Sequence, residues 1–218
     1  MFYVNLKYLK RKVFTVDKIS VIVPCFNEED VLPLFYQEVT KVLESIENTT
    51  YELLFINDGS SDHTEDLIKL MAHKNKQCFY YSFSRNFGKE AAMYAGLENA
   101  TGDYVVIMDA DLQHPPYLLK EMYHSLKEEN YDCCAGKRID RTGEGKLRNF
   151  LSHSFYKVIQ TLTKMDMDDG AGDFRMMTRQ MVDAILELKE YNRYMKGLFS
   201  FVGFNTKWLE FHNVERQG

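Results

Sequence analysis

Short apolar runs alternate with amphipathic segments through the first half of the chain. Four runs predict strands, at residues 19–24, 51–56, 78–83 and 104–108. Runs that are apolar almost without a break are typical of strands covered on both faces, as in a parallel sheet. We therefore expect these four strands to form a sheet that is buried on both sides.

The segments between the runs carry apolar residues at helical spacing. They predict helices over residues 31–46, 62–71, 88–98 and 115–126. We expect Asp30 to cap the first helix, and Asp62 or Ser61 to cap the second, because these side-chain oxygens can accept a backbone N–H. Strands that alternate with helices are typical of right-handed βαβ units. The sequence therefore predicts a three-layer α/β/α domain with a mostly parallel central sheet.

The second half has a less regular pattern. It predicts a helix over residues 147–165, a strand over 174–178, a helix over 180–188 and a last strand around 208–211. A chain of 218 residues suits one large domain. We therefore expect a basic and aromatic extension over residues 1–17, followed by one folded domain over residues 18–218.

Composition narrows the class of protein. The net charge of -5 argues against nucleic acid as the main partner. No stretch reaches 18 apolar residues, so we expect no membrane span in the chain. The spacing of the four cysteines fits neither a zinc site nor a disulfide framework, and it indicates reduced thiols in the cytoplasm. These cysteines are Cys25, Cys78, Cys133 and Cys134.

Each of the four predicted strands ends in small and polar residues. The four ends are residues 24–29, 57–62, 84–89 and 109–114. In a parallel α/β sheet, ligands bind at the carboxyl ends of the strands. One polar strand end is a coincidence, but four along one edge predict a binding site.

The triplet Asp109-Ala110-Asp111 is the sharpest of these ends. Two carboxylates two residues apart can face one side of an extended strand end. They can hold Mg²⁺ or Mn²⁺, which prefer oxygen ligands and share them with substrate phosphates. Such a cation offsets the charge that builds on a departing diphosphate. The alternative is two solvated loop aspartates, but a buried strand before the triplet and the pair Pro115-Pro116 after it favour the metal site.

The first two strand ends carry candidates for binding a nucleoside. Asn27, Glu28 and Glu29 can hydrogen-bond a nucleoside, or they can simply start a helix, where acids are favoured. Asp58 can accept a hydrogen bond from a base N–H, or it can belong to an Asp-Gly turn. Neither loop decides the matter by itself.

Basic side chains near the predicted site suggest phosphate contacts. Arg85 and Lys89 are candidates for binding a diphosphate, with ordinary surface charge as the alternative. A later basic stretch that includes Arg138 and Arg148 suits a phosphate-bearing partner or a solvated loop. Asp173 follows a glycine-rich turn and can act as a general base on an acceptor, or it can be a turn residue.

Five stretches of the sequence match a known family: VIVPCFNEE, ELLFINDGSSDHT, SRNFGKEAAMYAGLENATGDYVVIMDADLQHPP, AGKR and GAGDFRMMTR. With them the chain resembles the inverting glycosyltransferase family 2, whose nucleotide-sugar domain has the GT-A fold. Within that family it is similar to the branch that transfers sugars to polyprenyl phosphates. Dolichyl-phosphate mannosyltransferases and bactoprenol glucosyltransferases belong to this branch. The long third stretch is the most specific.

The resemblance implies roles for residues on the donor side. Those that match the nucleotide-binding opening motif are Pro24, Asn27, Glu28 and Glu29. Asp58 matches the acid that reads the base. Asp109 and Asp111 match the pair that binds the metal and the diphosphate, which makes Asp111 a catalytic candidate.

The resemblance also implies an acceptor side. Gln113 follows the aspartate pair at the spacing of this branch. Positions that contact the phosphate of acceptor or donor are matched by Arg138, Arg148 and Ser152. Asp173 matches an acid near the acceptor that many relatives use as the base, and it is the second catalytic candidate.

The activity implied is transfer of a sugar, with inversion, from UDP-glucose or a close relative to a polyprenyl phosphate or another cell-envelope acceptor. It would need Mg²⁺ or Mn²⁺ and would take place at the inner face of the cell membrane, by a monomer or a homo-oligomer. The alternative is a nucleotide-binding scaffold module without turnover. Two other enzyme classes fit less well. A dehalogenase-like phosphatase would carry its aspartates after the first strand, whereas here the pair follows the fourth. A Rossmann dehydrogenase would show G-x-G-x-x-G after the first strand, and this sequence does not.

One feature departs from the family pattern. Members of this branch usually continue past an R-x-G motif into transmembrane or amphipathic helices, whereas this sequence stops at Arg216-Gln217-Gly218. We therefore expect the membrane-contacting C-terminal part to be missing from this chain.

Overall fold

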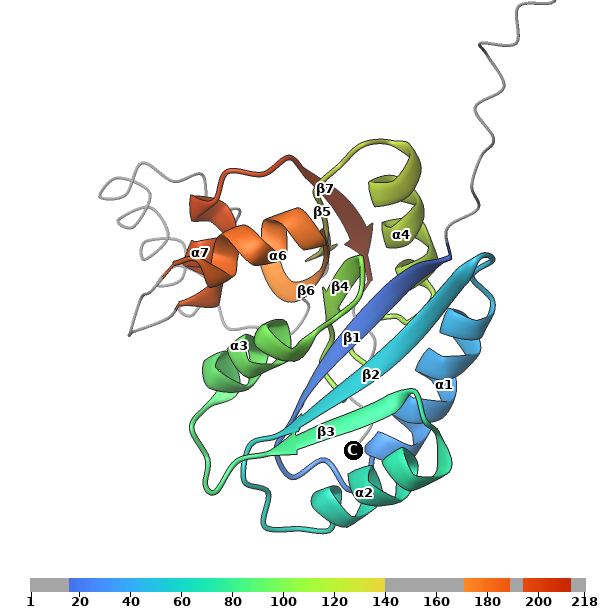
Figure 1. Cartoon of the computed structure of the whole chain (residues 1–218), viewed down its shortest axis with the longest axis vertical. Coiled ribbons are helices and arrows are strands. Elements are labelled where there is room, and N and C mark those ends of the chain that lie inside the picture. Colours follow the sequence, from blue (N-terminus) through green and yellow to red (C-terminus); the bar gives the residue numbers. More distant parts are fainter. Residues whose placement is uncertain (1–15, 140–170, 189–193, 213–218) are drawn as a thin grey trace, which may run out of the picture.

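The computed structural model of the chain describes residues 16–139, 171–188 and 194–212. The described strands form one seven-stranded sheet in the order β3-β2-β1-β4-β6-β5-β7 (Figure 1). Their bounds are Asp17–Cys25 for β1, Thr49–Asn57 for β2, Cys78–Ser82 for β3, Tyr104–Ile107 for β4, Cys133–Arg138 for β5, Ala171–Thr178 for β6 and Thr206–Phe211 for β7. Asp17 therefore lies in the first strand, while residues 1–15 of the expected extension lie outside the described residues.

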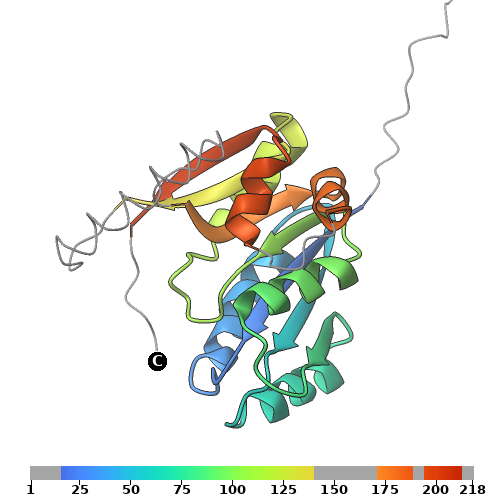
Figure 2. The same ribbon diagram turned by 90° about the vertical axis from the view of Figure 1, so that its left-hand side faces the viewer.

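Helices cover both faces of the sheet (Figures 1 and 2). One face packs against α1 (Leu32–Glu44), α2 (Thr64–Lys74) and α4 (Leu118–Glu128). The other face packs against α3 (Lys89–Asn99), α6 (Arg179–Leu186) and α7 (Met195–Phe201). The predicted three-layer α/β/α architecture with a mostly parallel central sheet is confirmed.

Alternation along the central strands divides the core into two layers. In β1, Val21 and Val23 face the cluster that includes Phe35 of α1, whereas Ile22 faces the cluster that includes Met93 of α3. All five side chains are almost completely buried. Because both faces are covered, these strands read as unbroken apolar runs, as the sequence analysis assumed.

The parallel and antiparallel parts of the sheet meet at β4. Strands β3, β2, β1 and β4 are parallel to one another, as the four apolar runs predicted. Strand β6 then pairs antiparallel with both β4 and β5, and β7 pairs parallel with β5. The antiparallel register places Ile107 opposite Arg175. As a result, the end of β4 lies beside the beginning of β6.

Two expectations about local structure were wrong, and a third holds only in part. Strand β3 is an edge strand, and its aromatic side chains Phe79, Tyr80 and Tyr81 are exposed instead of buried. Asp30 does not cap α1, because Val31 is the N-cap residue and no side chain bonds there. His63 is the N-cap residue of α2 and makes no side-chain cap, but Asp62 does accept the backbone N–H of Thr64, the first helical residue, at 3.0 Å.

The second half follows the sequence pattern in part where it is described, since α7 was not predicted. The expected strands near residues 174–178 and 208–211 correspond to β6 and β7, and the expected helix 180–188 corresponds to α6. Strand β5 was not predicted, because three of its six residues, Gly136, Lys137 and Arg138, are not apolar. The helix predicted over residues 147–165 lies outside the described residues.

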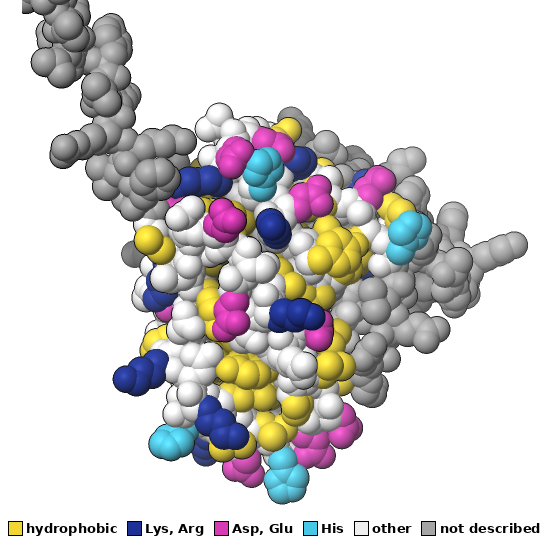
Figure 3. Space-filling model, turned by 90° about the vertical axis from the view of Figure 1, so that its right-hand side faces the viewer, with side chains coloured by type: hydrophobic (Ala, Val, Ile, Leu, Met, Phe, Trp, Pro, Cys, Tyr) yellow, Lys and Arg dark blue, Asp and Glu magenta, His cyan; other side chains and the backbone are white. Residues whose placement is uncertain are grey.

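The outer surface of the first helical layer carries mixed charge. Figure 3 shows acidic and basic side chains interspersed on the side of the molecule seen there. Within the described ranges, no helix has the length and apolar character that a membrane crossing requires. The four cysteines are buried free thiols, as their spacing predicted.

Candidate functional site

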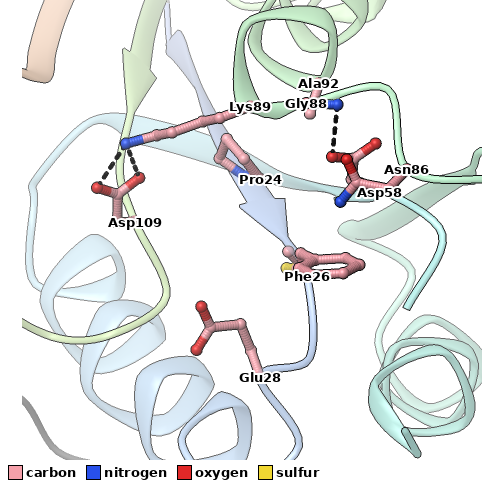
Figure 4. Close-up of a pocket in the computed structure, with 10 residues that line it drawn as sticks. Pro24, Phe26, Glu28, Asp58, Asn86, Gly88, Lys89, Ala92 and Asp109 are labelled. Atoms are coloured by element: carbon pink, nitrogen blue, oxygen red, sulfur yellow. Dashed lines mark hydrogen bonds and ion pairs between the residues drawn. The ribbon is translucent and has the colours of Figure 1, made fainter. Parts of the chain in front are cut away.

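A pocket of about 200 Å³ opens where β1, β2 and β4 end (Figure 4). It is lined by Pro24, Cys25, Phe26, Glu28, Asp58, Asn86, Gly88, Lys89, Ala92 and Asp109. Five of the residues that the sequence singled out are among them: Pro24, Glu28, Asp58, Lys89 and Asp109. The structure thus brings all four strand ends to one place, as expected for the carboxyl edge of a parallel sheet.

Asn27 and Glu29 hold the loop after β1 against the loop after β2. The side-chain oxygen of Asn27 accepts a hydrogen bond from the backbone N–H of Ser61 at 2.8 Å. The Glu29 carboxylate accepts one from the N–H of His63 at 2.8 Å. Neither residue lines the pocket. Their side chains therefore position the pocket walls, a role that the sequence did not reveal.

Asp58 holds the loop that follows β3. It is 3% exposed, and its two carboxylate oxygens accept the backbone N–H groups of Phe87 at 2.7 Å and of Gly88 at 2.9 Å. The contact with Gly88 is visible in Figure 4. An ionised carboxylate that accepts two backbone N–H bonds is strongly held. Asp58 lies at the pocket, and it fixes the shape of the neighbouring loop there.

Gly59 lets the loop after β3 approach the end of β2. Its φ is +68°, and a Cβ at this position would lie 2.4 Å from the carbonyl carbon of Arg85. No other residue has room there. This close approach explains why the chain has a glycine directly after Asp58.

Lys89, the first residue of α3, joins two carboxylates from different strands. Its ammonium nitrogen lies 2.7 Å from Oδ1 and 2.8 Å from Oδ2 of Asp109, which follows β4. It also lies 2.8 Å from Oδ2 of Asp173 in β6. Figure 4 shows the lysine side chain reaching across the pocket to Asp109. The other oxygen of Asp173 is buried and has no hydrogen-bond partner in the described part of the chain.

The charges in this triad stabilise one another. Burial disfavours the charged form of Lys89, but Asp109 and Asp173 outweigh burial and raise its pKa. Burial likewise opposes the charge on Asp173, yet Lys89, Lys196 and Arg175 lower its pKa. Asp173 is therefore ionised at neutral pH, and its cationic neighbours make it a weaker base than an ordinary aspartate.

Asp111, Gln113 and Arg138 form a second group beside the pocket. Oδ1 of Asp111 accepts the backbone N–H of Gln113 at 3.1 Å, and Arg138 donates to the side-chain oxygen of Gln113 at 3.2 Å. Leu112 between them has a φ of +55°, a region that costs a branched residue conformational energy. The turn thus links Asp111 to Gln113, whose side chain is in turn held by Arg138. Arg148 and Ser152 lie outside the described residues.

Two residues of the site carried no assigned role in the sequence analysis. His114 is 7% exposed, its ring stacks on Phe174 at 4.8 Å, and its Nδ1 accepts the N–H of Asp109 at 3.4 Å. Burial lowers the pKa of His114. The neutral ring therefore accepts the N–H of Asp109 and helps to fix its backbone. Phe26 lines the pocket although it is 46% exposed. An exposed ring at a strand end is the signal that could have identified it.

Arg85 and Cys25 contribute less than their positions suggest. The guanidinium of Arg85 lies 3.9 Å from the ring centroid of Phe87, and Arg85 does not line the pocket. Cys25 does line it, but burial raises the pKa of its thiol well above the ordinary value. The thiol stays protonated, which argues against a role as nucleophile.

The donor atoms fit a cation that is shared with a diphosphate. In residues 16–139, 171–188 and 194–212, no group of three or more His, Cys, Asp or Glu side chains is arranged to hold a metal ion. Asp109 and Asp111 supply carboxylate oxygens at a partly exposed strand end. Mg²⁺ and Mn²⁺ are commonly held by one or two carboxylates and completed by phosphate oxygens and water. The site matches this arrangement and does not match a cage built from protein alone.

The family model described as "Glycosyl transferase family 2" matches residues 20–186. The chain belongs to this family. The match extends from β1 through β6 and so includes every strand that contributes to the pocket or to the Lys89 triad. The resemblance noted in the sequence is confirmed at the level of the family.

Curated relatives agree with the family assignment. CsbB of Bacillus subtilis, named as a glycosyltransferase, is 46% identical over 91% of this chain and 60% of the relative. The bactoprenol glucosyl transferase of Shigella phage SfX is 39% identical over 91% of this chain and 65% of the relative. The chain thus spans less than two thirds of the length of these relatives.

Solved structures show the same fold at low sequence identity. Glucosyl-3-phosphoglycerate synthase from Mycobacterium tuberculosis, in complex with Mn²⁺, UDP-glucose and phosphoglyceric acid, matches with a TM-score of 0.62 and 19% identity. The match covers 93% of this chain and 72% of that one. The mannosyltransferase PcManGT from Pyrobaculum calidifontis, in complex with GDP-mannose and Mn²⁺, matches with a TM-score of 0.64 and 18% identity, over 92% and 57%. Both neighbours thus hold Mn²⁺ with a nucleotide sugar.

Proposed function

We propose that this chain transfers a sugar, most simply glucose from UDP-glucose, to a polyprenyl phosphate, with inversion at the anomeric carbon. The observation that carries the proposal is the meeting of Asp109, Lys89 and Asp173 beside one pocket. The pocket of about 200 Å³ supports binding of part of a nucleotide, Asp109 on its wall supports a cation there, and the Asp173 carboxylate lies within reach of the same lysine. The names of the bactoprenol relatives support the choice of glucose and of the acceptor.

The lining of the pocket supports the proposal that the donor nucleotide binds there. The exposed ring of Phe26 gives a base a flat apolar surface, and Asn86 and Glu28 offer polar groups at the rim. The diphosphate would then extend toward Lys89 and Asp109. Asp109 and Asp111 would hold Mg²⁺ or Mn²⁺, which supplies Lewis-acid stabilisation of the departing diphosphate.

The acceptor decides what Asp173 has to do. An alcohol must lose a proton as it attacks, so it needs a base within reach. A polyprenyl phosphate is already an anion, so it needs positioning by cations instead. Arg138, which is fixed by Gln113 beside Asp111, is the described cation placed to do this. Arg148 and Ser152 are proposed to complete the phosphate site.

The acceptor also places the reaction at a membrane. A polyprenyl chain is embedded in lipid, so the pocket must face the membrane surface from the cytoplasmic side for a nucleotide sugar to meet it. Segments outside this chain, of the kind that the longer relatives have room for, are proposed to provide the attachment.

The proposal is tested by nucleotide binding and turnover. We would titrate UDP and GDP by calorimetry, with and without Mn²⁺, into the wild-type chain, Asp111→Asn and the control Asp66→Asn, an exposed position on α2. We expect UDP binding that needs Mn²⁺, that Asp111→Asn loses and that the control keeps. Glucose transfer from UDP-glucose to a short-chain polyprenyl phosphate should follow the same order.

Two results would contradict the proposal. A folded wild-type chain that binds neither nucleotide has no donor site of this kind. Binding without any turnover, when the acceptor is supplied in detergent micelles, would favour a scaffold module derived from a glycosyltransferase.

A further inference from the structure

The Lys89 ammonium occupies the point where the carboxylates of the site converge. Three carboxylate oxygens, two from Asp109 and one from Asp173, lie 2.7–2.8 Å from its nitrogen. A small cation that binds Asp109 from the pocket side needs the same oxygens. The ammonium and a divalent cation therefore compete for one position, since like charges this close repel each other strongly.

The Lys89 side chain is exposed enough for its ammonium to move away from the two carboxylates. Its side chain is 41% exposed, whereas that of Asp109 is 27% and that of Asp173 is 14% exposed. A lysine carries its charge on a flexible stem, so the ammonium can swing toward the pocket while the carboxylates stay in place. A diphosphate in the pocket would offer it new anionic oxygens in exchange for those it gives up.

From this geometry we propose that Lys89 guards the cation site and makes binding of the divalent cation depend on nucleotide. Without nucleotide, the ammonium holds Asp109 and Asp173 together and weakens binding of the cation by competing with it. When the diphosphate arrives, Lys89 moves to it, the cation takes Asp109, and Asp173 is released toward the acceptor. The inference rests on the proposed function, because it assumes a nucleotide diphosphate in this pocket.

The experiment measures Mn²⁺ itself and not turnover. Free Mn²⁺ would be followed by electron paramagnetic resonance in titrations of wild type, Lys89→Met and Lys69→Met, each with and without UDP. Lys69 is the matched control, because it also pairs with a carboxylate, Glu65, but lies on α2 away from the pocket. Cooperative thermal unfolding is checked for each variant, and Lys89→Gln, which keeps a hydrogen-bond donor, replaces the methionine variant if that does not fold.

We expect UDP to tighten Mn²⁺ binding by wild type and by Lys69→Met about tenfold or more, within the usual range for coupled sites. Lys89→Met should bind Mn²⁺ about tenfold more tightly than wild type without UDP, and UDP should add little. Equal affinity of wild type and Lys89→Met without UDP would overturn the guarding role while leaving the cation site in place. Loss of Mn²⁺ binding by all three proteins, with UDP present, would overturn the proposed donor site as well.

Wild-type protein provides a second readout that needs no variant. Acylation of lysines by an amine-reactive reagent, quantified by peptide mass spectrometry, reports on the freedom of each ammonium. Saturating Mn²⁺ without nucleotide should raise the labelling of Lys89 severalfold and leave Lys69 unchanged. Labelling of Lys89 that does not respond to Mn²⁺ occupancy would mean that the ammonium is not displaced, and the inference would be wrong.

Discussion

The two parts of the sheet hold their functional side chains in different ways. In the parallel part, formed by β1 to β4, side chains bond to the backbone of neighbouring loops, as Asp58 does with Phe87 and Gly88. Two pairs that involve β5 and β6, Lys89–Asp173 and Arg138–Gln113, instead join one side chain to another. Bonds to backbone fix a shape, whereas pairs between long side chains can exchange partners. The loops after β1 and β2 are thus held by bonds to backbone, whereas the Lys89–Asp173 and Arg138–Gln113 pairs are contacts that can be remade.

The largest expected effect is a difference in kcat between variants of the two catalytic candidates, Asp111 and Asp173. With a polyprenyl phosphate acceptor, Asp111→Asn should lower kcat by about 10²–10³, the usual loss when charge stabilisation in the transition state is removed. Asp173→Asn should lower it by only about tenfold, since an anionic acceptor needs no proton removal. Initial rates with UDP-glucose at saturating Mn²⁺ measure both values. A larger loss from Asp173→Asn would mean that the acceptor is an alcohol.

The next effect compares two glycines with nearly the same backbone conformation. Gly59 in the parallel part has a φ of +68° and Gly203 beyond α7 has a φ of +69°, but only at Gly59 would a Cβ meet backbone atoms. We expect Gly59→Ala to cost about 3 kcal/mol or more of unfolding free energy, and Gly203→Ala about 1 kcal/mol. Urea unfolding measures both. Similar losses at the two sites would show that the loop after β3 is less tightly held than described.

A buried hydrogen-bond network around Glu52, in the parallel part of the sheet, should make the stability of the protein depend on pH. Glu52 is 3% exposed and bonds to Ser20, Thr101 and Lys18. Burial opposes its charge, but hydrogen bonds from these three residues lower its pKa below 4.5. The stabilisation is therefore complete above pH 4.5 and is lost as the pH falls through the lower, folded-state pKa.

Glu52→Gln tests this linkage. It should cost about 2 kcal/mol at neutral pH, where a charged hydrogen-bond acceptor is lost. It should cost much less near pH 3, where the wild-type carboxyl is being protonated as well. Thermal unfolding of both proteins from pH 3 to pH 7 measures the difference. A constant difference across that range would assign the effect to packing.

The smallest effect concerns a helix end far from the pocket. Asn130 follows α4 with a φ of +60°, a conformation that asparagine tolerates better than alanine does. Asn130→Ala should lower the unfolding free energy by about 1 kcal/mol and leave UDP affinity unchanged. A change in UDP affinity would show that the end of α4 influences the pocket.

The parallel part was predicted well from the sequence, because strands buried on both faces consist of unbroken apolar runs. Unbroken apolar runs gave β1, β2 and β4, and the polar strand ends gave Asp58, Lys89 and Asp109 at the pocket. The same rule failed for β3, where Phe79 and Tyr81 lie on an exposed edge. Aromatic residues favour strands in either setting, so composition does not distinguish an edge from a centre.

The partners of the polar side chains were not predictable in the same way. Asn27 and Glu29 bond to residues more than thirty positions away, and Lys89 bonds to Asp173 across 84 positions. Periodicity carries no information about such pairs, because they depend on how separate loops fold onto one another. His114 was overlooked for the same reason, since only the stacked Phe174 shows that its ring is a support.

The antiparallel pairing of β4 with β6 also has a consequence for the order in which the protein folds. Strands β1 to β4 lie within 91 residues of one another in the chain, whereas β6 begins at Ala171. Contacts between distant segments form late, because closing a long loop costs entropy. During synthesis, Asp109 and the loops that line the pocket would therefore emerge well before Asp173. Until β6 pairs with β4, the Lys89 ammonium would have Asp109 as a partner but not Asp173.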